Sequence, residues 1–192
     1  MPDAPPSLPH RKLCQRYNDP GHAHFLTYSC FHRQPFLSRD RVKGWLCDAL
    51  TRGLDEHEFH LWAYVVMPEH LHLVVYPTTA MYDISSFLKS TKQSVALKAV
   101  AHVRTTAPEF LVHMKDGQGR RRFWQRGGGY DHNLWTWERI WDKIDYIHAN
   151  PVRRGLCNRP ADWIWSSAAD YLALRQGPLR IDRTYLPPDP RY

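Results

Sequence analysis

The sequence predicts an α+β fold, with an antiparallel sheet covered by helices on one face. Strand composition, rich in β-branched and aromatic residues, occurs at 24–31, 59–66 and 70–76. Helical spacing of apolar residues occurs at 38–53 and 83–98. The resulting order is strand, helix, strand, strand, helix, which favours a ferredoxin-like layered arrangement.

The composition indicates one domain with an acidic partner. The chain of 192 residues can bury a core, and its hydrophobic content of 43% excludes general disorder. Lys and Arg number 26 against 19 Asp and Glu, a formal charge of +7 that suits nucleic acid but also an ordinary basic protein. No apolar run has transmembrane length and no signal peptide is visible, so we expect no membrane contact and a cytoplasmic, nucleoid-associated location. The cysteines show no Cys-x-x-Cys pairing and are expected to be scattered thiols.

Changes in composition suggest three segments. Residues 1–21 are rich in proline and charge and are expected to form a flexible N-terminal tail. Residues 22–172 carry the periodic patterns and form the folded domain. Residues 173–192 are expected to be an extended C-terminal tail, which could order on binding DNA or stay disordered.

The first two predicted helices each have an apolar stripe. Ser38 can cap the first helix, and Gly53 marks its end region. Asp83 or Ser85 opens the second. The stripe positions are Val42, Trp45, Leu46, Ala49 and Leu50 in the first helix, and Ile84, Phe87, Leu88, Thr91 and Val95 in the second.

The two central strands flank a short Met67-Pro68-Glu69 break, so an antiparallel pair is expected. In the second of them His70 and His72 point to one face, while the apolar residues between and after them point to the other. Helices would cover that apolar face and leave the histidine face open. Two neighbouring imidazoles can bind a metal ion, but they can equally be solvated histidines on an open sheet face.

Residues 105–119 are predicted to be loop-like, with a short strand at 110–114. Basic residues then surround Phe123 and Trp124, a mixture that suits phosphate contact and base stacking, or a solvated loop with a buried Trp. Residues 127–129 are three glycines and are expected to be a flexible joint. They lack the flanking elements of a phosphate-binding loop.

Residues 137–149 are predicted to form a helix whose stripe contains Ile140, Ile144 and Ile147. Tyr146 falls almost opposite that stripe, which is unusual for a packing residue, and Asn150 lies one turn further on the same side. Because Pro151 disfavours a helical Asn150, we expect the helix to end there. Asn150 is therefore either a plain helix terminus or a ligand beside an exposed tyrosine.

These residues match a known family. The segment 67–75 resembles the HUH motif (His, hydrophobic, His) of single-tyrosine transposases. The segments 123–125, 145–152, 154–156 and 162–167 resemble the REP-associated tyrosine transposases (RAYTs) within that superfamily. The resemblance extends over residues 22–172 and rests on several motifs in the same order.

The resemblance implies a ferredoxin-like endonuclease and strand transferase, a transposase that acts on single-stranded or hairpin DNA of repeats. It matches His70 and His72 to metal ligands and Tyr146 to the nucleophile. Asn150 stands where relatives place a third ligand. Glu69 stands where many relatives have Asn, and it receives no role.

The chemistry requires these groups. A tyrosine oxygen that attacks phosphorus keeps the bond energy in a 5′-phosphotyrosine link, so rejoining needs no ATP. A bound metal would polarise the phosphate, and two imidazoles with a carboxamide suit Mg²⁺ or Mn²⁺. His148, a water molecule or substrate phosphate could each take the tyrosine proton.

Two other functions remain compatible with the sequence. One is a DNA-hairpin-binding protein without catalysis, and the other is a metal-dependent hydrolase built on the two histidines. The relatives do not decide between a monomer and a homodimer with exchanged tyrosine helices. The candidates for contacts with the DNA backbone, of which we expect fewer than half to touch DNA, are Lys89, Lys92, Arg120, Arg121, Arg122, Arg126, Lys143, Arg153 and Arg154.

Overall fold

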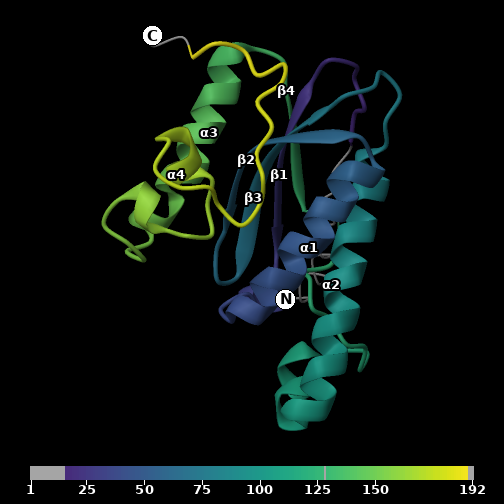
Figure 1. Cartoon of the computed structure of the whole chain (residues 1–192). Helices are drawn as coiled ribbons and strands as arrows, with labels where there is room; N and C mark the ends of the chain where they lie inside the picture. The colour runs from purple at the N-terminus through teal and green to yellow at the C-terminus, as the bar shows by residue number, and fades with distance from the viewer. Residues whose placement is uncertain (1–15, 128, 190–192) are drawn as a thin grey trace, which may run out of the picture.

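A four-stranded antiparallel sheet forms the centre of the protein (Figure 1). The computed structural model describes residues 16–127 and 129–189. The strands are β1 (Ala23–Ser29), β2 (Phe59–Val66), β3 (His70–Pro77) and β4 (Tyr130–Leu134), in the order β2-β3-β1-β4. With the intervening helices this is the ferredoxin-like topology, which confirms the predicted fold class.

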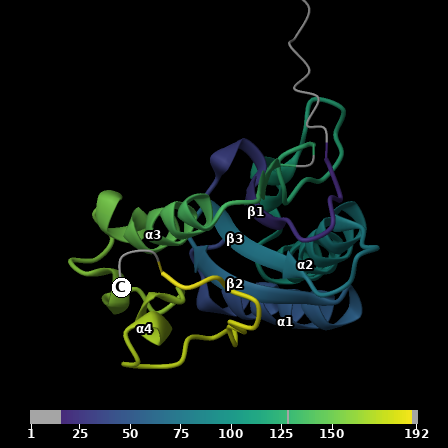
Figure 2. The same cartoon turned by 90° about the horizontal axis from the view of Figure 1, so that it is seen from above.

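The helices α1 (Asp40–Glu56) and α2 (Ile84–Thr106) cover one face of the sheet, as predicted (Figure 2). The Asp83 side chain caps α2 by accepting a hydrogen bond from the Ser85 amide, whereas no side chain caps α1. Gly53 lies in the last turn of α1, as expected. A Cβ there would lie 2.6 Å from Thr91 Cγ2, so Gly53 permits the close approach of α2.

The other face of the sheet carries α3 (Trp137–Arg153), which contradicts the expected open histidine face (Figure 2). The stripe Ile140, Ile144 and Ile147 packs there against Val74 and other apolar residues of the sheet. Apolar side chains therefore line both faces of the sheet, and helices cover each face. The helix also continues through Pro151 to Arg153 instead of ending at Asn150, and the proline removes one i→i−4 hydrogen bond from its last turn.

The segments between the main elements hold two further differences from the predictions. Residues 108–114 form a 3₁₀-helix (Pro108–Met114) instead of the expected strand. Strand β4 was not predicted. It pairs with β1 beside Gly129, where a Cβ would collide with the Thr27 carbonyl oxygen. Short 3₁₀-helices at Phe31–Arg33 and Pro160–Asp162 and the helix α4 (Ala168–Tyr171) complete the secondary structure.

The described parts of both predicted tails contact the domain. Asn133 donates a hydrogen bond to the Tyr17 carbonyl, and Tyr82 donates one to the Asp19 carbonyl. On the C-terminal side Leu179 is buried, and the indole of Trp62 donates to the Thr184 carbonyl. The remainder of the two tail predictions, at 1–15 and 190–192, lies outside the described residues. Over the described ranges no helix has the length and hydrophobicity needed to cross a membrane.

Candidate active site

Two imidazoles meet on the face of the sheet that α3 covers. His70 and His72 lie on β3 with one residue between them, each 5% exposed, and their Nε2 atoms are 3.1 Å apart. This arrangement follows from the two-residue repeat of a strand, which places both side chains on one face. The predicted histidine pair is therefore buried and convergent, and it is not solvated.

The far side of each imidazole ring is held by a hydrogen-bonding group. His72 Nδ1 lies 2.7 Å from the Thr27 hydroxyl on β1, directly across the strand pair. His70 Nδ1 donates to Glu69 Oε1 at 3.1 Å. A carboxylate can only accept, so this bond leaves a lone pair on His70 Nε2. Such outer contacts are typical of histidines that bind a metal ion.

Burial keeps both imidazoles neutral at neutral pH. Burial lowers the pKa of His72 to about 3, with smaller contributions from His70, Arg33 and Lys143. Burial also lowers the pKa of His70, although Glu69 opposes it. Burial acts to raise the pKa of Glu69, but the hydrogen bonds and charges of Arg154 and His70 together outweigh it and lower the pKa. Neutral imidazoles are the form that binds metal ions.

Two residues of α3 complete the cluster. The Asn150 side chain is buried and its amide nitrogen lies 3.2 Å from His72 Nε2. The Tyr146 ring is 36% exposed and stands edge-on to the His72 ring at a centroid distance of 5.3 Å. The predicted shared helix face of these two residues is confirmed, and it faces the histidines. Tyr146, Asn150, His70 and His72, predicted from separate parts of the sequence, lie together.

A small basic pocket opens at this cluster. It has a volume of about 190 Å³, and its lining residues are Arg33, His70, Tyr146, Asn150, Arg153 and Arg154. The Arg153 guanidinium lies 5.3 Å and the Lys143 ammonium 5.8 Å from the centre of the Tyr146 ring. Anions are therefore favoured beside the tyrosine, since positive charge surrounds it.

Arg33 and Glu69 were missed as site residues in the sequence. Arg33 has a φ of 54° and follows His32, whose φ is 50° and whose amide donates to the Gln125 side chain. No periodicity marks such a turn, because the strained backbone is held by a residue 93 positions away. Glu69 adjoins His70 in the chain, and that adjacency was the one available signal.

His148, one candidate base, does not reach the cluster. Its Nε2 hydrogen-bonds the Ser167 hydroxyl at 2.8 Å, and its ring contacts Tyr171, on the side of α3 away from Tyr146. Position 148 is two residues along the helix from position 146, which corresponds to a rotation of about 200°. His148 is thus a packing residue, and the prediction that it could act as the base is wrong.

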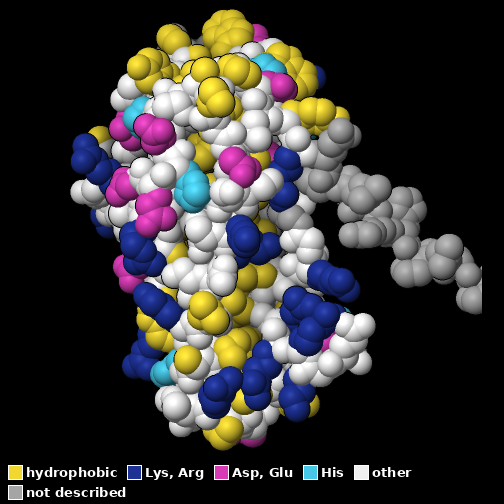
Figure 3. Space-filling model, turned by 90° about the vertical axis from the view of Figure 1, so that its right-hand side faces the viewer, with side chains coloured by type: hydrophobic (Ala, Val, Ile, Leu, Met, Phe, Trp, Pro, Cys, Tyr) yellow, Lys and Arg dark blue, Asp and Glu magenta, His cyan; other side chains and the backbone are white. Residues whose placement is uncertain are grey.

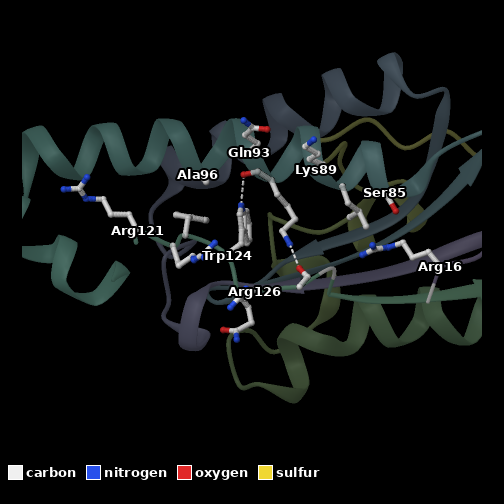
Figure 4. A pocket seen from close by; sticks show the side chains of 14 residues that line it. Arg16, Ser85, Lys89, Gln93, Ala96, Arg121, Trp124 and Arg126 are labelled. Carbon is white, nitrogen blue, oxygen red and sulfur yellow. Dashed lines mark hydrogen bonds between the residues drawn. The ribbon is translucent and has the colours of Figure 1, made fainter. Parts of the chain in front are cut away.

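A second basic surface lies between α2 and the segment 121–127. This groove has a volume of about 420 Å³ (Figure 4). Among the described residues that line it there is no Asp or Glu. Its cationic lining residues are Arg16, Lys89, Lys92, Arg121, Arg122 and Arg126. In a space-filling view of this side of the molecule, Lys and Arg side chains gather in the middle and lower part (Figure 3).

The predicted DNA contacts divide between the two surfaces. Lys89, Lys92, Arg121, Arg122 and Arg126 line the groove, whereas Lys143, Arg153 and Arg154 lie at the tyrosine pocket. Arg120 lines neither and pairs with Asp116 at 3.1 Å. Arg16 and Gln93 are groove residues that the sequence did not indicate.

Trp124 forms the floor of the groove and does not offer a free stacking face. The side chain is 7% exposed, and its indole donates to the Lys92 carbonyl at 2.8 Å (Figure 4). Of the two predicted interpretations for this tryptophan, burial is therefore correct. Trp163 and Trp165, which were expected in the core, are partly buried and pack against the core residues.

The histidine pair and the neighbouring carboxamide are donors that can hold a divalent cation with few protein ligands. Across the described residues no group of three or more His, Cys, Asp and Glu could hold a metal ion. The Asn150 carboxamide lies beside the pair and is a candidate third ligand. Two imidazoles and one amide oxygen leave positions for phosphate oxygens and water.

Comparisons with known proteins agree with this architecture. No family model matches the chain. A Haemophilus influenzae protein assigned to the REP-associated tyrosine transposases is 23% identical over 136 residues, which cover 67% of this chain and 74% of that protein. The structure of a REP-associated tyrosine transposase bound to a REP hairpin is similar, with a TM-score of 0.65 and 22% identity. That match covers 88% of this chain and 90% of the other.

A further crystal structure, of a transposase-like protein from Deinococcus radiodurans, matches over 67% of this chain and 88% of its own, at 22% identity. Its TM-score of 0.44 is too low to support an inference. The similarity to the Haemophilus influenzae protein agrees with the resemblance to REP-associated tyrosine transposases that the sequence motifs indicate. The solved structure supports the fold.

Proposed function

We propose that this chain is a transposase of the REP-associated tyrosine type, a metal-dependent endonuclease and strand transferase for single-stranded hairpin DNA. The observation that carries the proposal is the convergence of His70, His72, Asn150 and Tyr146, from two separate elements, at one basic pocket. A metal hydrolase would not need the tyrosine at that position. The similarity to a transposase bound to a REP hairpin suggests the same class of substrate.

In this mechanism the Tyr146 oxygen attacks the scissile phosphorus in line. The new bond joins the tyrosine oxygen to phosphorus, and the bond from phosphorus to the 3′ oxygen breaks. The 3′ oxygen leaves and takes up a proton, while Tyr146 gives its own to water or to substrate phosphate, because His148 lies elsewhere. The reverse attack by a 3′ hydroxyl joins strands and releases the tyrosine.

His70, His72 and Asn150 would hold the metal ion, with Mg²⁺ or Mn²⁺ as the expected species. The imidazoles are neutral and one Nε2 has a lone pair fixed by Glu69, as metal binding requires. When bound, the ion would polarise the scissile phosphate and neutralise its developing charge. For this role the Asn150 side chain would turn so that its oxygen, instead of the nitrogen that lies 3.2 Å from His72 Nε2, faces the metal ion.

The arginines and lysines position the strand. Arg33, Arg153 and Arg154 line the pocket and would hold phosphate oxygens near Tyr146. The groove beside α2 would bind the backbone at other positions of the same strand. Because α3 packs on the sheet of its own chain, one chain supplies histidines and tyrosine together, so we propose that a monomer suffices.

The test is formation of a covalent protein–DNA species. A single-stranded hairpin oligonucleotide from repeats that flank the gene, labelled on its 3′ side, is incubated with Mn²⁺ and the protein, and the products are separated under denaturing conditions. We expect a protein-sized labelled band from wild type, and none from Tyr146→Phe although it still binds the hairpin. Tyr185→Phe is the matched control, because Tyr185 is an exposed tyrosine outside the pocket.

The same gel distinguishes the alternatives. Nicked DNA that persists in Tyr146→Phe would contradict the tyrosine mechanism and favour a metal hydrolase. Tight hairpin binding by wild type without nick or band, over a range of pH and metal ions, would favour a binding protein that keeps the fold. A band retained in Tyr146→Phe but lost in Tyr185→Phe would show that the wrong nucleophile is assigned.

A further inference from the structure

Glu69 occupies a buried position beside the histidine pair, with no function yet assigned. Its side chain is 9% exposed, and its Oε1 atom is shared by three cationic or donor groups. His70 Nδ1 lies at 3.1 Å, Arg154 Nη1 at 2.7 Å and Arg33 Nη2 at 3.5 Å. A buried carboxylate is costly unless it is paired, so these contacts explain how it is tolerated.

The direction of the hydrogen bonds gives the carboxylate a specific effect. Because ionised Glu69 can only accept, His70 must carry its ring hydrogen on Nδ1 when neutral. The lone pair then lies on Nε2, which faces His72. Without the acceptor, the neutral ring could place its hydrogen on Nε2, where it would block the metal side. The carboxylate also makes the ring a stronger electron donor.

The partner on the other side of Glu69 lines the tyrosine pocket. The Arg154 side chain is 49% exposed, yet its guanidinium reaches inward to the buried carboxylate. Arg154 and His70 both line the small pocket beside Tyr146. One carboxylate thus holds a candidate metal ligand and a candidate phosphate-binding arginine in fixed relation.

We propose that Glu69 is a positioning residue that sets the ring tautomer of His70 and directs Arg154 toward the pocket, and that it thereby raises the affinity of the site for a divalent cation. The second half rests on the proposed metal site, whereas the tautomer of His70 can be observed without any metal. Loss of such an outer contact typically weakens metal binding about 10- to 100-fold.

The variants separate the hydrogen bond from the charge. Glu69→Gln keeps an acceptor oxygen for His70 but loses the negative charge, and Glu69→Ala loses both. Glu56→Gln is the matched control, because Glu56 is exposed at the end of α1. His70→Ala reports the affinity that remains when a ligand itself is removed. Circular dichroism of each variant establishes that the fold is kept.

Two measurements test the proposal on the full chain. Ring ¹⁵N chemical shifts at neutral pH give the tautomer of His70, and electron paramagnetic resonance of free Mn²⁺ gives the affinity without DNA. We expect His70 to be protonated at Nδ1 in wild type, Glu56→Gln and Glu69→Gln, and to shift toward an Nε2-protonated mixture in Glu69→Ala. We expect Mn²⁺ binding to weaken about 10- to 100-fold in Glu69→Ala and less in Glu69→Gln.

Three results would overturn the proposal or part of it. An unchanged tautomer and an unchanged affinity in Glu69→Ala would remove any positioning role. A loss in Glu69→Gln as large as in His70→Ala would make Glu69 a direct ligand. If His70→Ala does not change Mn²⁺ binding, the proposed metal site fails. If the His70 tautomer still depends on Glu69 in that case, only the positioning role of Glu69 remains, without its effect on metal affinity.

Discussion

The basic groove predicts a measurable change in the salt dependence of DNA binding. The perturbation replaces Lys89, Arg121 and Arg126 together by Gln, which removes three charges from a lining without carboxylates. Each phosphate contact on single-stranded DNA contributes about 0.7 to the slope of log affinity against log salt. Three lost contacts reduce that slope by about 2. At 0.15 M salt this corresponds to about 50-fold weaker binding, or about 2.3 kcal/mol.

The assay is fluorescence anisotropy of a labelled hairpin, without metal, over a series of salt concentrations. The matched control replaces Arg39, Arg41 and Arg52 by Gln, three exposed residues of the α1 side that line no part of the groove. Both triple variants lower the net charge of +7 by three, so overall charge cannot explain a difference between them. Equal slopes for the two variants would refute the assignment of the groove to DNA.

Three further predictions concern packing and charge. Gly53→Ala should destabilise the fold by about 1–2 kcal/mol in urea unfolding, because its Cβ would lie 2.6 Å from Thr91 Cγ2. The control Gly44→Ala, whose Cβ would have no atom within 4 Å, should stabilise the fold by up to about 1 kcal/mol, and a stabilised Gly53→Ala would contradict the tight helix contact. Burial lowers the pKa of Lys92 to about 8, so hairpin affinity should fall between pH 7 and pH 9 in wild type but not in Lys92→Arg; the same pH profile of affinity in both proteins would contradict this role of Lys92. The free energy of unfolding of wild type should also decrease as pH falls from about 10 toward 8, because Lys92 gains its proton in the unfolded chain first. Asp131→Ala should lower the free energy of unfolding by about 3 kcal/mol in thermal unfolding, because its buried carboxylate lies 2.8 Å from the buried His24 Nδ1 on β1. A change below about 0.5 kcal/mol would show that this pair is not a stabilising contact.

The elements that a local pattern defines were predicted well. The stripe from Ile84 to Val95 forms the buried side of α2, and the alternation in β3 places His70 and His72 together on one face. The same local argument put Tyr146 and Asn150 on one side of a helix. Such patterns arise from 3.6-residue and two-residue repeats, which need no knowledge of distant contacts.

The patterns without a strong repeat were not predicted. Strand β4 is only five residues long and its side chains are mostly part-exposed, so its sequence lacks a clear alternation. The segment 108–114 has strand-like residues, but its leading Pro108 suits the first turn of a 3₁₀-helix. The place of Gly53 near the end of α1 was predicted, but its close contact with Thr91 was not, because that contact joins residues 38 positions apart.

By itself the sequence determined which residues could carry the chemistry, since residue types and local periodicity are properties of short segments. Only the tertiary structure decided which of them meet. The covering of the histidine face by α3, the separation of His148 from Tyr146, and the contacts of Glu69 with Arg154 and Arg33 depend on packing between distant segments. A residue's role in a site depends on its neighbours in space, and those are set by how the apolar faces of sheet and helices bury one another.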